Sequence, residues 1–151
     1  MTKDKIESLK EYLLEIDPCI EFDEKNEDKL IGYAERFGGV IIPMYNDINT
    51  FILDCPKSTL DIVSTMNSSS RKADGFEDTI IGHINIDGNT LILHDKDKML
   101  EQMIAEYEAD EDMEEEEDYS FYTMALEYFE FNIIGAYMDG VPAFATLDGW
   151  D

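Results

Sequence analysis

Apolar residues at helical spacing open the chain. Ile6, Leu9, Leu13 and Ile16 follow one another at intervals of three or four residues, with charged residues between them. This spacing is typical of an amphipathic helix with one buried face. Pro18 cannot continue a helix, because it lacks the backbone N–H and clashes with the preceding turn. The pattern therefore predicts a first helix that ends just before Pro18.

Two short blocks then occur twice. Residues 27–33 match residues 77–83 at an offset of 50, and residues 49–53 match residues 89–93 at an offset of 40. Each second block leads into apolar residues at helical spacing. These are Leu60, Val63 and Met66 in the first copy, and Met99, Leu100, Met103, Ile104 and Tyr107 in the second.

These matches predict an internal duplication that covers residues 27–66 and 77–107. Each copy would be a strand, a turn, a strand and a helix, with Ile31 and Ile81 in equivalent buried strand positions. Residues 40–45 add an apolar segment to the first copy, and we interpret it as an extra strand whose proline suits a sheet edge. A chance match between two short blocks is the alternative.

The last third of the chain holds a dense apolar stretch. Between Phe121 and Tyr137 apolar residues fall on more than one helical face. This density predicts a largely buried helix that starts near Glu114, covers residues 114–137 and stops between Gly135 and Gly140. Residues 141–147 should then form a terminal strand, and Trp150 should cover an edge of the core.

With 151 residues, of which 44% are hydrophobic, the chain is long enough for one core and short for two. We therefore expect a single domain, residues 1–151, of the α+β class. Its sheet should be mainly antiparallel or mixed and built from two repeated strand–strand–helix units, with flanking helices. An acidic segment, residues 106–118, should precede the C-terminal helix and strand, residues 114–147.

Charge changes the functional picture. The chain has 36 Asp and Glu against 11 Lys and Arg, a formal net charge of −25. Such a chain has no general basic face for nucleic-acid phosphates or anionic lipid, so direct binding to nucleic acid or membrane is not expected. No Lys or Arg follows Lys98, and residues 110–118 are acidic at eight of nine positions. A partner, if there is one, should be basic.

Residues 77–147 resemble a group of small, mostly uncharacterised acidic bacteriophage proteins. The resemblance rests on three stretches: residues 80–82, the helix start at residues 95–100, and residues 125–132 leading into residues 135–137 and 142–144. It implies a phage setting and a hairpin, two helices and a final strand. Its motifs are of the kind found in cores, and it implies no catalytic activity.

The residues that could carry chemistry have simpler structural interpretations. His83 falls where the other copy has Tyr33, which favours a packed ring, and Asp95 after His94 suits a helix cap. Cys19 and Cys55 match no metal-binding spacing, so we expect buried, reduced thiols. We predict no catalytic residue, metal or cofactor, and hence no enzyme.

The acidic run is the feature that most suggests a function. Carboxylates four residues apart on a helix lie about 6 Å apart, a spacing comparable to that of nucleic-acid phosphates. The sequence thus predicts a non-catalytic phage inhibitor of the anti-CRISPR or anti-restriction type, which mimics nucleic acid on a basic host nucleic-acid-binding protein or nuclease. Its partner-binding residues would be Glu111, Asp112, Glu114, Glu115, Glu116, Glu117 and Asp118.

Four other interpretations stay open at this point, one of them a structural virion or host-takeover protein with unrelated contacts. An immunity protein or antitoxin that neutralises a basic toxin would need the same acidic surface. A metal-dependent enzyme would use His83, His94 and nearby acids. A solvated acidic loop without a partner is also common. The charged N-terminus, without an apolar segment, predicts no signal peptide, so we expect the cytoplasm of the host cell; the sequence leaves the oligomeric state open.

Overall fold

The structure, a computed structural model, describes residues 3–36, 40–45, 51–53, 55–65, 72–73, 75–86, 88–134 and 142–147. In these residues the helices are α1 (Lys3–Ile16), α2 (Pro56–Thr65), α3 (Lys96–Ala109) and α4 (Phe121–Tyr128). The short turns are the 3-10 turns η1 (Glu24–Lys29) and η3 (Glu77–Thr79) and the π-helical turn η4 (Phe129–Ile133). The strands are β1 (Leu30–Arg36), β2 (Val40–Tyr45), β3 (Phe51–Leu53), β4 (Ile80–Ile86), β5 (Asn89–Asp95) and β6 (Ala143–Leu147).

The strands form one mixed sheet in the order β2-β1-β6-β5-β4-β3. Two antiparallel hairpins, β1–β2 and β4–β5, lie on either side of β6, which runs antiparallel to β1 and parallel to β5. The last strand of the chain therefore joins the two hairpins into one sheet. The predicted α+β class with a mixed sheet is confirmed.

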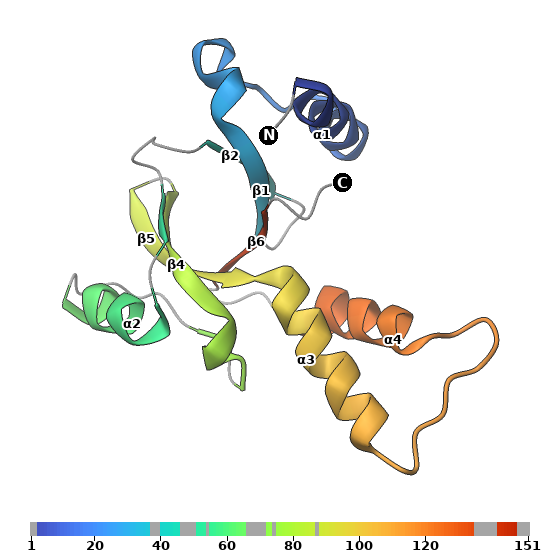
Figure 1. Cartoon of the computed structure of the whole chain (residues 1–151). Helices are drawn as coiled ribbons and strands as arrows, with labels where there is room; N and C mark the ends of the chain where they lie inside the picture. Colours follow the sequence, from blue (N-terminus) through green and yellow to red (C-terminus); the bar gives the residue numbers. More distant parts are fainter. Residues whose placement is uncertain are drawn as a thin grey trace.

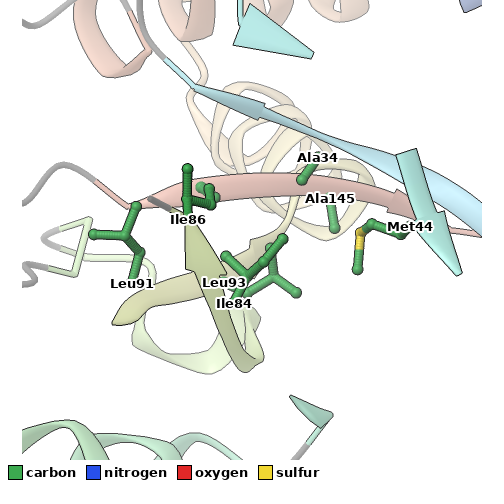
Figure 2. Close-up of a cluster of buried hydrophobic side chains, with 8 residues drawn as sticks. Ala34, Met44, Ile84, Ile86, Leu91, Leu93 and Ala145 are labelled. Carbon is green, nitrogen blue, oxygen red and sulfur yellow. The ribbon is translucent and has the colours of Figure 1, made fainter. Parts of the chain in front are cut away.

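The sheet is curled, and its inner face carries a core made of strand residues. Inner side chains from β1, β2, β4, β5 and β6 meet there, and Phe51 of β3 packs against them. Figure 2 shows Ala34, Met44 and Ala145 facing Ile84 and Leu93 in this cluster. The buried members are Ala34, Met44, Ile84, Ile86, Leu91, Leu93, Ala143 and Ala145.

The short connection between β2 and β3 requires the sheet to curve. The edge strands β2 and β3 are consecutive in sequence, and only six Cα steps separate Tyr45 from Phe51. Six steps reach at most about 21 Å. The outer strands of a flat six-stranded sheet would lie about 24 Å apart. The sheet must therefore bend to bring its two edges within reach.

The helices pack on the outer face of the curl (Figure 1). The buried residues of α1 contact β1 and β2, α2 lies on β4 and β5, and the pair α3–α4 packs on Phe144 of β6. The first helix forms where the apolar spacing predicted it. Strand β2, with Pro43, lies at the sheet edge as predicted, since an edge strand tolerates a residue without an N–H.

The predicted duplication is not confirmed as a repeated strand–strand–helix unit. The hairpin partner of β1 is β2, whereas the segment matched to β5 lies in β3 and pairs with β4 of the other copy. Ile31 and Ile81 do fall in strands, each directly after the first strand residue that follows a 3-10 turn, but both are half-buried rather than buried.

The two matched segments, residues 27–33 and 77–83, each place a glycine at an irregular point of a strand. The register shifts just before Gly32 in β1 and just before Gly82 in β4. A Cβ on Gly32 would lie 2.1 Å from the Thr146 carbonyl oxygen, and one on Gly82 would lie 1.9 Å from that of Ile52. Both glycines allow a neighbouring backbone to approach closely.

Candidate functional site

Helices α3 and α4 form a hairpin that projects away from the sheet, and the acidic residues join them at the far end (Figure 1). Asp95 caps α3, because its carboxylate accepts a hydrogen bond from the Lys98 N–H at 3.2 Å. The base of the hairpin is held by Phe129, whose ring packs edge-on against Phe144 with centroids 4.9 Å apart. One end of the hairpin is thus fixed in the core, and the other end points into solvent.

We name residues 110–118 the acidic loop. All seven predicted contact residues lie in it, and all seven are exposed: Glu111, Asp112, Glu114, Glu115, Glu116, Glu117 and Asp118. The structure thus brings them together on one loop at the tip of the hairpin.

The prediction of a helix from residue 114 was wrong. Helix α4 begins at Phe121, and Ser120 caps it by accepting the Thr123 N–H at 3.1 Å. Residues 114–118 offer no apolar side chain that could hold a helix against the protein, and four consecutive glutamates would repel one another along it. The predicted end of this helix, at Gly135–Gly140, lies outside the described residues, as does Val141. The strand expected at residues 141–147 is present from Ala143.

Local hydrogen bonds order the acidic loop. Asp110 accepts the Asp112 N–H at its carboxylate (2.9 Å) and the Met113 N–H at its carbonyl (3.1 Å), which makes a turn directly after α3. Glu116 and Tyr119 then exchange backbone hydrogen bonds of 3.3 and 3.1 Å. The carboxylates therefore follow two tight turns and do not have the helical spacing that the sequence suggested.

Tyr119 ties the end of the loop to α4. Its hydroxyl donates a hydrogen bond to the Glu127 carboxylate, nearly two turns into the helix, and this bond to an anion raises the pKa of Tyr119. Together with the Ser120 cap, this contact fixes the point at which the chain leaves the loop. The acidic loop is therefore anchored at both of its ends.

No positive charge of the hairpin lies near the acidic loop. Lys98 is the last basic residue of the chain, and about 16 Å of helix separates it from the end of α3. That distance exceeds the screening length of about 8 Å at physiological ionic strength. Lys96, also at the start of α3, pairs with Glu35 at 3.0 Å. The negative potential of the loop is therefore not neutralised from within the hairpin.

Helix α4 is less buried than predicted. Phe121, Ala125 and Phe129 face the core, but Tyr122 is 54% exposed and Phe131 is 76% exposed. Burial of an aromatic ring of this size is worth about 2 kcal/mol, so leaving Phe131 in water forgoes most of that stabilisation. Apolar density alone could not separate the buried rings from the exposed ones, because both kinds recur at helical spacing.

Tyr128 is 48% exposed, while Tyr137 and Trp150, which was expected to cover an edge of the core, lie outside the described residues. Phe131 was missed as a surface residue. It falls in the π-helical turn η4, in which the Ile134 N–H reaches back five residues to the Phe129 carbonyl at 2.9 Å. Such wide turns are rare and often lie at functional sites.

His94 is a structural residue. It is fully buried, and its Nε2 accepts the Ala73 N–H at 3.0 Å. Thr79 donates its own hydroxyl proton to the Phe76 carbonyl, so it must accept a proton from Nδ1 of His94, 2.9 Å away. Burial lowers the pKa of His94 to about 4. The neutral ring with its proton on Nδ1 holds the segment before β4 against β5.

His83 is 5% exposed, in agreement with the prediction of a packed ring. Cys19 and Cys55 are free thiols, but the prediction that they are buried was wrong, because both are exposed; Cys19 lies in the turn after α1, and Cys55 directly precedes α2. Within the described ranges no three His, Cys, Asp or Glu side chains are grouped so that they could hold a metal ion.

A shallow cavity of about 410 Å³ lies between α1 and η1. Its lining is mostly acidic, and the Lys10 ammonium already pairs with Glu27 there. The lining residues are Lys3, Ile6, Glu7, Glu24, Glu27 and Asp28. They include no nucleophile with an adjacent base, so the cavity adds acidic surface and no catalytic arrangement.

In the part of the chain that the structure describes, no helix combines the length and the apolar character needed to cross a membrane. A scan against protein-family models, a search of curated proteins and a search of solved structures each found no match. The functional argument therefore rests on the geometry and charge of this chain.

Proposed function

We propose that this protein is a non-catalytic inhibitor from a phage or mobile element that acts in the host cytoplasm. It would occupy the basic nucleic-acid-binding surface of a host nuclease or defence complex, of the kind that anti-CRISPR and anti-restriction proteins block. The observation that carries the proposal is the acidic loop, whose carboxylates are exposed at the tip of a projecting hairpin that has no Lys or Arg after Lys98.

Charge density supports the proposal even though the loop is not helical. Eight carboxylates in nine residues, fully extended, would lie along at most about 30 Å, or one charge per roughly 4 Å. One strand of DNA carries one charge per about 3.4 Å. The two turns of the loop shorten its path further. A basic groove would therefore meet a density of negative charge similar to that of its usual ligand.

The order of the loop also supports the proposal. A flexible acidic tail would lose conformational entropy when it bound, whereas a segment held by turns and by the Tyr119–Glu127 contact loses less. Carboxylates that displace phosphates release the same counterions from the partner, so the affinity should depend on salt in the manner of a nucleic acid.

The first experiment compares two variants of equal charge. One replaces Glu114, Glu115, Glu116 and Glu117 by Gln in the acidic loop. The matched control replaces four exposed glutamates of α1 and the segment after it by Gln: Glu7, Glu11, Glu15 and Glu21. Both variants lose four negative charges, so they differ only in where the charge is removed.

Each protein is immobilised and used to capture DNA-binding proteins from a bacterial host lysate at 50 and 200 mM salt, with and without competing double-stranded DNA. We expect the wild type and the control to capture a basic protein that competing DNA releases. Its binding should be much weaker at 200 mM salt than at 50 mM salt. The loop variant should recover far less of it. Equal recovery by the loop variant and the wild type would contradict the proposal.

A further inference from the structure

The exposed side chains on one flank of α4 and η4 are not explained by the acidic loop. Met124 and Tyr128 are four positions apart on α4, a spacing that makes neighbours on a helix surface, and Phe131 follows them in the π-helical turn η4. Phe131 is 76% exposed, Tyr128 is 48% exposed and Met124 is half-buried. We call these three residues the aromatic flank.

The aromatic flank lies beside negative charge. Glu127 and Glu130 alternate with its members along the helix, both are exposed, and no Lys or Arg follows in the sequence. Two interactions attract a cation to an aromatic face next to carboxylates. One is with the quadrupole of the ring, and the other is with the negative charge of the carboxylates. Arg suits such a surface better than Lys, because its planar, weakly hydrated guanidinium stacks on rings while it pairs with carboxylates.

The same partner could contact the acidic loop and the aromatic flank. Along the helix axis, the flank extends from about 6 Å to about 16 Å beyond Ser120, where the loop ends. A standard protein interface covers about 800 Å² on each side, which corresponds to a patch roughly 30 Å across. Aromatic side chains at the centre of such a patch typically contribute much of the affinity.

We propose that the aromatic flank is a docking surface for arginine side chains of a basic protein partner, next to the acidic loop. This inference rests on the proposed function, because it assigns a second contact to the same partner. The acidic loop supplies long-range attraction, and the flank distinguishes an arginine-rich surface from other positive surfaces.

The test uses hexa-arginine and hexa-lysine peptides as probes of equal charge, with affinities measured by calorimetry at 150 mM salt. We expect the wild type to bind hexa-arginine more tightly than hexa-lysine. The double variant Tyr128→Ala, Phe131→Ala should lose about fivefold in affinity for hexa-arginine and little for hexa-lysine. The matched control is Tyr122→Ala, which removes an exposed ring about 120° around the helix axis from Tyr128.

The two proposals fail separately in this experiment. The proposed docking surface is contradicted if the flank variant keeps the wild-type preference for hexa-arginine. It is also contradicted if the variant loses affinity for both peptides by the same factor. The four-glutamine loop variant should bind both peptides more weakly than the wild type, and by a similar factor. If it binds both peptides as the wild type does, the proposed function fails as well. Because Tyr128 and Phe131 are exposed, the variants should melt as the wild type does, which separates lost contacts from lost folding.

Discussion

Lys96 Nζ lies 3.0 Å from Glu35 Oε1, and the pair joins the start of α3 to β1 across the intervening strand β6. Both side chains are about five-sixths buried. The ammonium group also lies 4.8 Å from the centre of the Phe129 ring, at the base of the hairpin. One lysine therefore links both hairpins of the sheet to the helices that carry the acidic loop.

Breaking this pair from one side should be costly. Lys96→Met leaves the Glu35 carboxylate buried without its cation, and we expect it to lower the free energy of unfolding by about 2–3 kcal/mol. The double variant Glu35→Gln, Lys96→Met should recover part of that loss, because it removes the unpaired charge. Urea unfolding of the two single variants and the double variant measures the coupling.

The control for this cycle is the more exposed pair Lys10–Glu27, for which Lys10→Met should cost less than about 1 kcal/mol. Equal effects of Lys10→Met and Lys96→Met would show that the buried pair has no special role.

Stability should fall in mild acid because of His94. Its pKa is about 4 in the folded protein and about 6.5 when unfolded, so the unfolded chain takes up the proton first as the pH falls. The stabilisation is fully present above pH 6.5 and is lost between pH 6.5 and 4, with about 2 kcal/mol gone at pH 5. Urea unfolding at pH 7 and pH 5 tests this.

In His94→Gln the loss of stability between pH 7 and pH 5 should be about 2 kcal/mol smaller than in the wild type, whatever its absolute stability. A His94→Gln protein with the full wild-type response would assign the effect to carboxylates instead.

Gly82 should not tolerate a side chain. Its φ is +149°, and a Cβ would overlap the carbonyl of Ile52 in β3. We expect Gly82→Ala to cost more than about 3 kcal/mol and to loosen the β3 edge, which hydrogen exchange in β4 would report. Gly88→Ala is the matched control, since its φ is +81° but nothing lies within 4 Å, and it should cost about 1 kcal/mol.

The four-glutamine variant of the acidic loop should fold as well as the wild type. The loop carboxylates are exposed, and neutralising them removes repulsion between neighbours. We expect the free energy of unfolding to change by less than about 0.5 kcal/mol, or to rise slightly. A clear loss of stability in thermal unfolding would mean that these carboxylates have a structural role instead.

The sequence by itself determined the features that depend on neighbours along the chain. The spacing of Ile6, Leu9 and Leu13 placed α1, because one helical face decides burial over a few turns. The edge position of the strand with Pro43 and the cap at Asp95 followed from single residues whose backbone chemistry allows few alternatives. The charge asymmetry after Lys98 also needed no structure, since composition alone fixes it.

Only the tertiary structure decided which segments meet. It paired β3 with β4, and not with β1, because β2 and β6 occupy both edges of β1. It also decided that the last helix starts at Phe121 and not at the predicted residue 114. Residues 114–118 are all acidic, and a helix forms readily only where an apolar face can pack. The exposure of Phe131 depends likewise on how η4 lies on the core, and a one-dimensional pattern holds no information about that.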